Sequence, residues 1–587
     1  MDYGTAARRD GLLPSPQQAA GLAVSQPTPA TADGTGILIR PAPVPETERV
    51  TLQPLPATAA DGQEQLHRFA RLPVLSLIVI ILTVQAALSA TFLGADTASD
   101  YEALYLRAGH LEWAHWLHGV PIPAFATRFS GSPVIYPPLG ALADSLGGVA
   151  GARTLSLCFM VTATCLLWGT TARLFGRPAA FFAAAMFAVI GPTQHLGALA
   201  TIDSLALLLV ATAAWCACAA RTREDATGWV LASAAALALA NATMYSSVIF
   251  DPIVVIIAVL SACPNPGGKV AMRRGALLVT CLAGTLAALV RLGGPWYVAA
   301  ISQTMTPRPI ANVPVVTVLT ESWTWIAVVL VAALAGLALS VITKQGRAGS
   351  WLIAALAAAA LFVPLEQVRL QTTTALAEHL DFGAWFACIA GGYAVSTLAC
   401  LPRPRIMRAA AAVCLGVALV PVAATGISQA KAMINWPSST ALIAALKPLV
   451  RHGGRFLADT DSVAEYYLPG TSWQQWSDTT SITRRDGSVR YAAGKAAPYV
   501  HAIRRHLFAV VILNFAEPAL DRVIATAIRN AHSYQLITQV PYGGATPGTY
   551  VIWAYQPAQA PRASHIRSAG PAMRPGHVIA PGRQGGS

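Results

Sequence analysis

The sequence predicts a polytopic α-helical membrane protein with about eleven spans and a small external α/β domain near its C-terminus. Of 587 residues, 55% are hydrophobic and only 11% are charged, whereas about a quarter of a soluble protein is charged. Apolar runs long enough to cross a bilayer recur along the chain. The net charge of +13 does not indicate a nucleic acid partner, because the cations lie in short loops between apolar runs and in the two tails, as membrane topology requires.

Residues 1–66 are rich in Pro, Ala, Thr and Gln and lack hydrophobic periodicity, so we expect a disordered cytoplasmic tail. No signal peptide is predicted, because the first apolar run starts near residue 72. His67, Arg68 and Arg71 directly precede this run and hold the N-terminus in the cytoplasm by the positive-inside rule.

The membrane module is predicted over residues 67–428, in the plasma (inner) membrane. Five alternate loops carry cations, and this pattern with an odd number of spans places the chain after residue 428 outside. The cationic loops contain Arg173 and Arg177; Arg221 and Arg223; Lys269, Arg273 and Arg274; Lys344 and Arg347; and Arg403, Arg405 and Arg408. The predicted spans are 72–93, 152–172, 178–193, 200–220, 228–243, 246–263, 275–292, 323–343, 350–365, 382–401 and 408–427.

The first external loop, residues 94–151, begins with three carboxylates close together: Asp96, Asp100 and Glu102. Acidic residues are scarce in this chain, with 27 Asp and Glu in total, so a cluster at the membrane surface indicates either a site or a solvated acidic loop. Trp113 and Trp116 at helical spacing predict short helices along the interface.

The composition changes after the last span. Residues 429–557 are more charged and alternate helix-like segments, 439–451 and 519–530, with strand-like segments, 507–513 and 549–555. We therefore predict an extracytoplasmic α/β domain, followed by a disordered tail at 558–587 that is rich in Pro, Gly and Arg.

Two further acids lie at predicted external span ends. Asp203 starts the fourth span and Asp251 lies near the outer end of the sixth. An ionisable group at membrane depth costs about 2.5–3.5 kcal/mol on insertion scales, which favours a functional role. The structural alternatives are a helix N-cap for Asp203 and an Asp-Pro helix break for Asp251.

The topology gathers these carboxylates on one face, where they could serve as general base toward an acceptor hydroxyl or hold a divalent metal. Arg369 and His379 lie in a short external loop on the same face, so we predict that they bind a phosphate. Arg128, far along the first loop, is expected to lie away from that phosphate.

Several short motifs follow one another in a specific order. Together they resemble the glycosyltransferase C superfamily, in its protein O-mannosyltransferase and aminoarabinose-transferase-like branch (family 39), actinobacterial form. The resemblance is good over about residues 72–220 and looser in later spans. The motifs are the acidic stretch after span one, Tyr136-Pro137-Pro138-Leu139, Gly151-Ala152-Arg153-Thr154-Leu155-Ser156, Leu174-Phe175-Gly176, Ala198-Leu199-Ala200-Thr201-Ile202-Asp203 and His379-Leu380-Asp381-Phe382-Gly383.

The resemblance implies an enzyme that uses a polyprenyl-phosphate-linked sugar, mannose in type, and transfers it to a protein, glycan or lipid on the external face. In such families an Asp-Glu pair in the first loop carries the catalytic acid. Here the stretch reads Asp100-Tyr101-Glu102, so Tyr101 stands at the acid's position.

We therefore predict Asp100 or Glu102 as general base, with Asp203 beside it. The predicted substrate-binding residues are Tyr105, His110, Tyr136, Asp251, Arg369 and His379. Two alternatives stay open: a transporter or flippase of lipid-linked sugars, and a catalytically inactive relative that binds a cell-wall polymer.

Overall fold

The computed structural model describes residues 74–556, apart from 124, 126–127, 223–225, 262–267, 306–312, 401–404, 451–453, 485–487, 493–494, 516–517 and 545–546. The predicted tails at 1–66 and 558–587 lie outside the described residues. Leu72–Ser587 forms one compact unit.

The described part up to residue 433 is helical. Every predicted span coincides with one to three helical elements, although several helices extend beyond the apolar run that predicted them. The helices are α2 (Val74–Ala90), α3 (Asp100–His118), α4 (Tyr136–Phe175), α5 (Arg177–Val189), α6 (Gly191–Leu196), α7 (Ile202–Ala219), η2 (Ala220–Thr222), α8 (Thr227–Thr243), η3 (Tyr245–Phe250), α9 (Asp251–Leu260), α10 (Gly268–Met305), α11 (Val315–Ile342), α12 (Arg347–Ala358), η4 (Ala359–Leu361), α13 (Phe362–Leu370), α14 (Leu376–Ala399) and α15 (Arg405–Met433).

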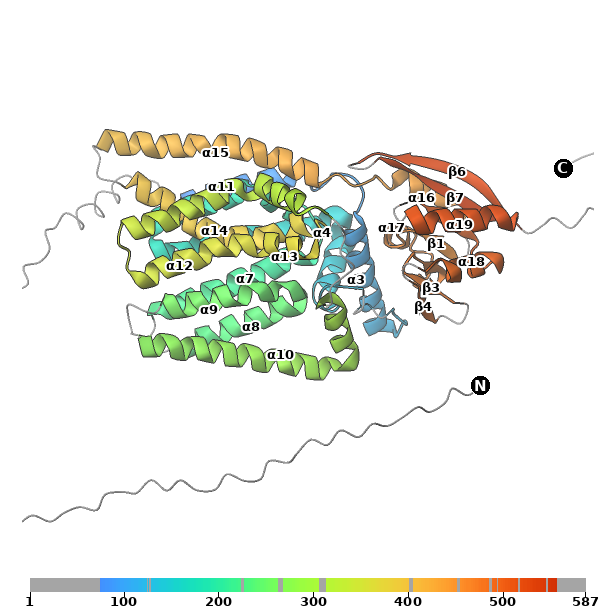
Figure 1. The fold of residues 1–587 in the computed structure, drawn as a ribbon, viewed down its shortest axis with the longest axis horizontal. Coiled ribbons are helices and arrows are strands. Elements are labelled where there is room, and N and C mark those ends of the chain that lie inside the picture. The colour runs from blue at the N-terminus through green and yellow to red at the C-terminus, as the bar shows by residue number, and fades with distance from the viewer. Residues whose placement is uncertain are drawn as a thin grey trace, which may run out of the picture. The chain divides into compact units, whose positions relative to one another are not determined.

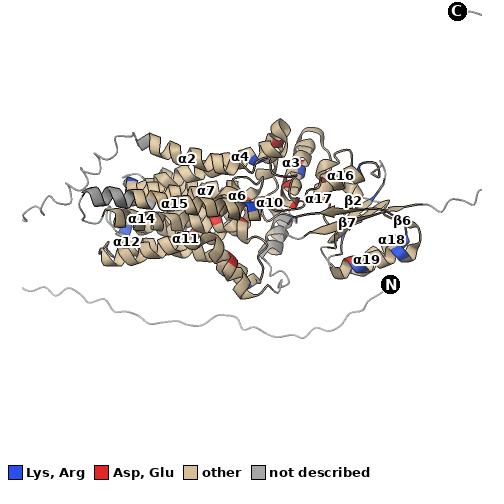
Figure 2. Cartoon of the chain, turned by 90° about the horizontal axis from the view of Figure 1, so that it is seen from above, with Lys and Arg blue, Asp and Glu red and all other residues tan. Residues whose placement is uncertain are grey.

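Six of the described helical segments are long and apolar enough to cross a membrane, and four shorter ones are apolar. Together with the fold they define a multi-pass membrane protein. Figure 2 shows that charged residues are sparse along the long helices. The six are Tyr136–Phe175, Ile202–Ala219, Gly268–Gly294, Val315–Ile342, Arg347–Leu370 and Leu376–Ala399.

Helix α3 runs across the long helices rather than along them (Figure 1). Its start is fixed by a capping box, in which the Ser99 hydroxyl accepts from the Glu102 N–H and the Glu102 carboxylate accepts from the Ser99 N–H. It packs so closely on the start of α4 that no side chain fits at Gly109. A Cβ atom at this position would overlap the backbone carbonyl of Pro137. Tryptophans Trp113 and Trp116 are both partly exposed on α3.

Helix α4 bends where the sequence contains Gly147 and Gly148. Gly148 has φ 63°, a conformation that residues with a side chain rarely adopt. The break separates residues 136–146, which belong to the predicted first loop, from the predicted second span.

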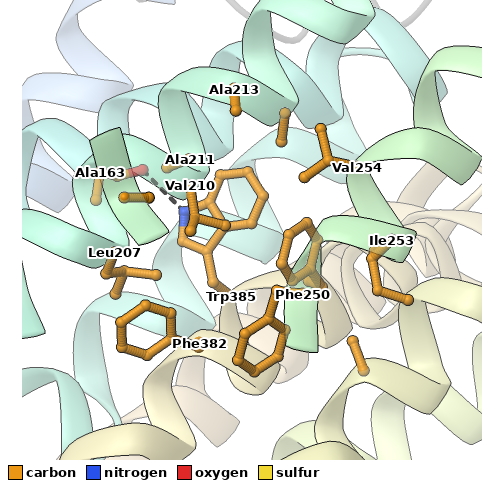
Figure 3. Packing of buried hydrophobic residues seen from close by; sticks show 14 of the residues in the cluster. Ala163, Leu207, Val210, Ala211, Ala213, Phe250, Ile253, Val254, Phe382 and Trp385 are labelled. Carbon is orange, nitrogen blue, oxygen red and sulfur yellow. Dashed lines mark hydrogen bonds between the residues drawn. The ribbon is translucent and has the colours of Figure 1, made fainter. Parts of the chain in front are cut away.

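The core of the helical part is built from α4, α7, α9 and α14. Trp385 is fully buried, and its indole N–H donates to the Ala163 carbonyl at 3.0 Å, which satisfies its polar atom. Phe250 and Phe382 stack beside it, with ring centroids 5.5 Å apart. Figure 3 shows these rings packed against Leu207 and Val210 of α7. This packing holds the starts of α7 and α14 next to each other.

Beyond α15 the chain forms a five-stranded mixed sheet with order β2-β1-β5-β7-β6, and a two-stranded sheet β3-β4. Strands β2, β1 and β5 are parallel, whereas β7 is antiparallel to both β5 and β6. The elements are α16 (Thr440–Leu446), β1 (Phe456–Ala458), α17 (Ser462–Tyr467), η5 (Trp473–Gln475), β2 (Trp476–Ser477), β3 (Ser481–Thr483), β4 (Val489–Tyr491), α18 (Ala496–Arg504), β5 (Val510–Leu513), α19 (Pro518–Ala531), β6 (Tyr534–Tyr542) and β7 (Gly548–Tyr555).

The C-terminal elements contact the start of α3. The Ala98 N–H donates to the Tyr467 hydroxyl at 2.8 Å, and the Trp436 indole N–H donates to the Thr97 carbonyl at 2.7 Å. The C-terminal elements therefore lie against the acidic segment that leads into α3.

Candidate functional site

A cavity of about 370 Å³ lies where α3, α7, α13 and α14 meet. It contains both acidic and basic side chains with apolar walls between them, as small-molecule sites usually do. Its lining residues are Tyr101, Leu104, Tyr105, Arg128, Ser130, Thr201, Ile202, Asp203, Met244, Ser246, Val248, Ile249, Glu366, Gln367, Arg369, Leu370, Thr372, Thr374, Ala375, Glu378 and His379.

Asp203 and His379 meet in this cavity. Asp203 lies in the first turn of α7 and His379 near the start of α14. The His379 Nε2 atom is 3.3 Å from Asp203 Oδ1, and both side chains are largely buried. The structure thus brings together two of the predicted residues that are 176 positions apart in the chain.

Two more carboxylates line the cavity, and the sequence analysis did not select either. Glu378 directly precedes His379, and Glu366 lies on α13, three residues before Arg369. Both acids were visible in the sequence as part of the short external loop, but nothing in their spacing distinguished them from solvated loop residues.

Arg128 is a correction to the sequence analysis, which expected it far from the phosphate-binding residues. It lines the same cavity as Arg369. Its guanidinium also lies 3.9 Å from the Asp461 carboxylate and 3.9 Å from the Asp478 carboxylate, both in the C-terminal part of the chain. The first loop folds back between α3 and η3, which sequence distance alone could not indicate.

Two tyrosines of α3 complete the wall. Tyr105, one of the predicted substrate-binding residues, is buried and contacts the ring of Phe129 at 5.1 Å. Burial, followed by the charge of Asp203, raises the pKa of its hydroxyl well above the ordinary range, so Tyr105 acts as a neutral hydrogen-bonding group. Tyr101 is 43% exposed and also lines the cavity.

Glu102 is fully buried outside the cavity lining and is paired with Arg153, which is 1% exposed. The guanidinium donates to both carboxylate oxygens at 2.8 Å. The Ala200 N–H donates to Oε1 at 2.9 Å and the Ser99 N–H to Oε2 at 2.9 Å. With both oxygens occupied in this way, the geometry favours a structural role for Glu102 over the role of base.

Arg153 also organises the chain that leads into α3. Its guanidinium donates hydrogen bonds to the backbone carbonyls of every second residue there: Leu93 at 3.1 Å, Ala95 at 2.7 Å and Thr97 at 3.3 Å. The indole ring of Trp436 covers the guanidinium at 5.5 Å. We call the pair Glu102–Arg153 the anchor.

Asp100 does not line the cavity. It faces Ser462 of α17, and burial raises the pKa of its carboxyl, with the Asp478 charge adding to the effect and the Ser462 hydrogen bond opposing it. Asp100 is therefore directed toward the C-terminal sheet rather than toward Asp203.

The remaining predicted residues, His110, Tyr136 and Asp251, do not line the cavity. The His110 ring is 2.6 Å from Asp144, which also accepts from the Tyr466 hydroxyl at 2.6 Å. Tyr136 is buried against Tyr105, with ring centroids 6.3 Å apart. Asp251 accepts from the Asn241 side-chain amide at 2.7 Å.

The fit of a divalent metal can be tested on the donor atoms. Among the described residues, no three His, Cys, Asp or Glu side chains are grouped so that they could hold an ion. The cavity acids come from three different helices and are accompanied by Arg128 and Arg369. The described side chains therefore do not form a metal site.

The fold and the site define the class of protein: a multi-pass membrane protein with a charged cavity at one end of its helices. The family of dolichyl-phosphate-mannose-protein mannosyltransferases matches residues 145–290, less than half of the chain. No curated protein matches.

Solved structures identify the fold. The apo oligosaccharyltransferase of Archaeoglobus fulgidus is similar with a TM-score of 0.54 at 11% identity, over 84% of this chain and 76% of that one. Apo ArnT from Cupriavidus metallidurans has a TM-score of 0.52 at 12% identity, over 82% and 98%. ArnT bound to undecaprenyl phosphate has a TM-score of 0.52 at 13% identity, over 81% and 97%. The chain therefore shares its fold with these two proteins.

Proposed function

We propose that this protein is a membrane glycosyltransferase that moves a sugar from a polyprenyl-phosphate donor to an acceptor on the external face. The observation that carries the proposal is the cavity in which Arg369 and His379 lie with the carboxylates of Asp203 and Glu378. Cations for a phosphate and carboxylates for an acceptor hydroxyl are the groups that this transfer needs.

Arg369 is the residue proposed to bind the donor phosphate, with His379 beside it. Arg369 lies in the last turn of α13 and is accessible from the cavity. A guanidinium can donate two parallel hydrogen bonds to phosphate oxygens. The pairing of His379 with Asp203 orients the imidazole, so that its second nitrogen is directed away from the acid.

The similarity to ArnT bound to undecaprenyl phosphate supports a lipid-linked donor. The match to a mannosyltransferase family supports mannose as the first sugar to test. The acceptor belongs to the hydroxyl-bearing or amine-bearing compounds, whether protein, glycan or lipid.

We further propose the topology with eleven spans, the N-terminus inside and residues 429–557 outside, in the plasma membrane. It places the cavity and the C-terminal sheet on the external side. Reporter fusions after Arg221 and after Gln429 are expected to report opposite compartments; the same compartment for both would contradict this topology.

The test of the activity uses the full-length protein in lipid nanodiscs with a panel of polyprenyl-phosphate sugars, starting with undecaprenyl-phosphate mannose. Release of polyprenyl phosphate is expected with at least one donor. Binding of donors without any release would favour the inactive relative, with Tyr101 in place of the family's acid. Movement of intact donor between leaflets would favour the flippase.

One observation supports the flippase as second candidate. Asp381 is fully buried within α14 and accepts from the Thr193 hydroxyl of α6 at 3.0 Å. Alternating-access transporters bind substrate at polar sites and broken helices near mid-membrane. Between α12 and α13 the segment Arg347–Leu370 contains the 3-10 turn η4, a local departure from the α-helix within one continuous helical segment. The leaflet-movement assay distinguishes the two functions directly.

A further inference from the structure

The carboxylates of this region differ in what already binds them. Both oxygens of Glu102 are engaged by Arg153 and by backbone N–H groups. Asp203 is paired with His379. Asp100 faces Ser462 and lies outside the cavity lining. Glu102 is thus fully engaged, Asp203 has one oxygen engaged by His379, and Asp100 is directed away from the cavity.

Glu378 stands apart from them. Its side chain lines the cavity from the first turn of α14. Within the described part of the chain it accepts no hydrogen bond and forms no ion pair, although Asp203 and His379 are its electrostatic neighbours. Glu366 also lines the cavity, but it comes from α13, on the same helix as Arg369, whereas Glu378 directly precedes His379 on α14.

The backbone fixes where Glu378 points. Leu376 and Leu380, which flank it on α14, are buried at 0% and 1% exposure. The aromatic packing around Phe382 holds the same helix against Phe250. A carboxylate on the first turn of a well-packed helix is a positioned group, as general acid–base catalysis requires.

We propose that Glu378 is the general base that accepts the acceptor's proton; this inference rests on the proposed glycosyl transfer. The acceptor oxygen forms a bond to the anomeric carbon of the donor sugar while the bond from that carbon to the phosphate oxygen breaks. The electron pair of the broken bond goes to the polyprenyl phosphate, which leaves beside Arg369. The acceptor's proton goes to the Glu378 carboxylate.

Glu378→Gln keeps the size of the side chain and removes its basicity. In full-length protein in nanodiscs, turnover with a hydroxyl acceptor is expected to fall by about 10²–10⁴-fold, the range for a general base. The KM for the polyprenyl-phosphate sugar should stay within about threefold, because Arg369 and His379 are intact. Glu321→Gln on α11, outside the cavity lining, is the matched control and should retain wild-type turnover.

Sodium azide separates loss of a base from loss of structure, because azide attacks without losing a proton. With azide as acceptor, Glu378→Gln should form the glycosyl azide at a rate within about threefold of wild type. Loss of both the hydroxyl and the azide reactions would overturn the role of base, as would hydroxyl turnover close to wild type. A wild-type protein that releases no polyprenyl phosphate from any donor would instead overturn the proposed function, and this inference with it.

Discussion

The anchor and the cavity each pair a carboxylate with a cation, but the two pairs differ in what surrounds them. Glu102 and Arg153 are closed off from solvent, and every side-chain nitrogen and oxygen atom of the pair has a hydrogen-bond partner. Asp203 and His379 make a single contact at 3.3 Å and line an open cavity. A buried ion pair whose hydrogen bonds are all made within the protein stabilises the fold. An ion pair in a cavity that still has unused donor or acceptor atoms can bind or act on a ligand.

The comparison changes the meaning of the acidic stretch at the start of α3. The anchor ties residues 93–102 to α4 and to the chain before α7. This contact sets the position of α3, and with it Tyr101 and Tyr105 in the cavity wall. Glu102 therefore serves the site through α3, and the acids that face a ligand come from α7, α13 and α14.

The largest effect is expected from breaking the anchor. Arg153→Ala leaves Glu102 buried without its partner, which costs about 3–5 kcal/mol in free energy of unfolding. Thermal unfolding followed by tryptophan fluorescence should show a strongly lowered midpoint, and Glu102→Gln should show a smaller decrease of the same sign. Arg369→Ala is the control and should keep the wild-type midpoint. An unchanged midpoint for Arg153→Ala would contradict the structural role of the anchor.

The next effect concerns Asp203. Asp203→Asn removes the negative charge that pairs with His379 but keeps the size of the side chain. Turnover should therefore fall by about 10²-fold, while the midpoint of thermal unfolding changes little. Turnover and midpoint are measured on the same nanodisc preparation. If the unfolding midpoint fell as well, Asp203 would have a structural role like that of the anchor, and the proposed difference between the two pairs would be wrong.

Arg369→Ala should act on the donor. Losing a bidentate partner of a phosphate costs about 1.5–3 kcal/mol, which raises the donor KM by about 10-fold or more with a smaller change in turnover. Lys344→Ala, between α11 and α12, is the control and should have no effect. Arg128 does not serve as a control because it lines the same cavity. Equal effects of Arg369→Ala and Lys344→Ala would count against the phosphate site.

The smallest effect is a dependence of stability on pH. Burial raises the pKa of the Glu465 carboxyl from 4.5 to about 7, against the opposing charges of Arg107 and Arg128. The folded chain therefore holds this proton where the unfolded chain has lost it, and stability falls as pH rises from about 4.5 to about 7, then levels off.

Glu465→Gln should flatten this dependence by about 1–3 kcal/mol between pH 5 and 8. Unfolding midpoints at four pH values measure it. Asp96→Asn, at an exposed position, is the control and should keep the wild-type slope. A variant Glu465→Gln with the same slope as wild type would show that another group carries the pH dependence.

The sequence by itself determined the helical membrane class, because apolar runs of sufficient length report directly on the solvent around them. It also selected Asp203, Arg369 and His379 from their places at predicted external span ends and loops, and Tyr105 from the acidic stretch that opens the first predicted loop. These four residues line one cavity in the structure.

Only the tertiary structure decided the rest. Glu102 and Asp100 are two residues apart, yet one is held by Arg153 and the other faces Ser462. Glu378 and Arg128 enter the cavity through helix packing and a folded-back loop. Spacing along the chain fixes which membrane face a residue reaches, but the partner of each charge is set by long-range contacts between helices, which local periodicity does not encode.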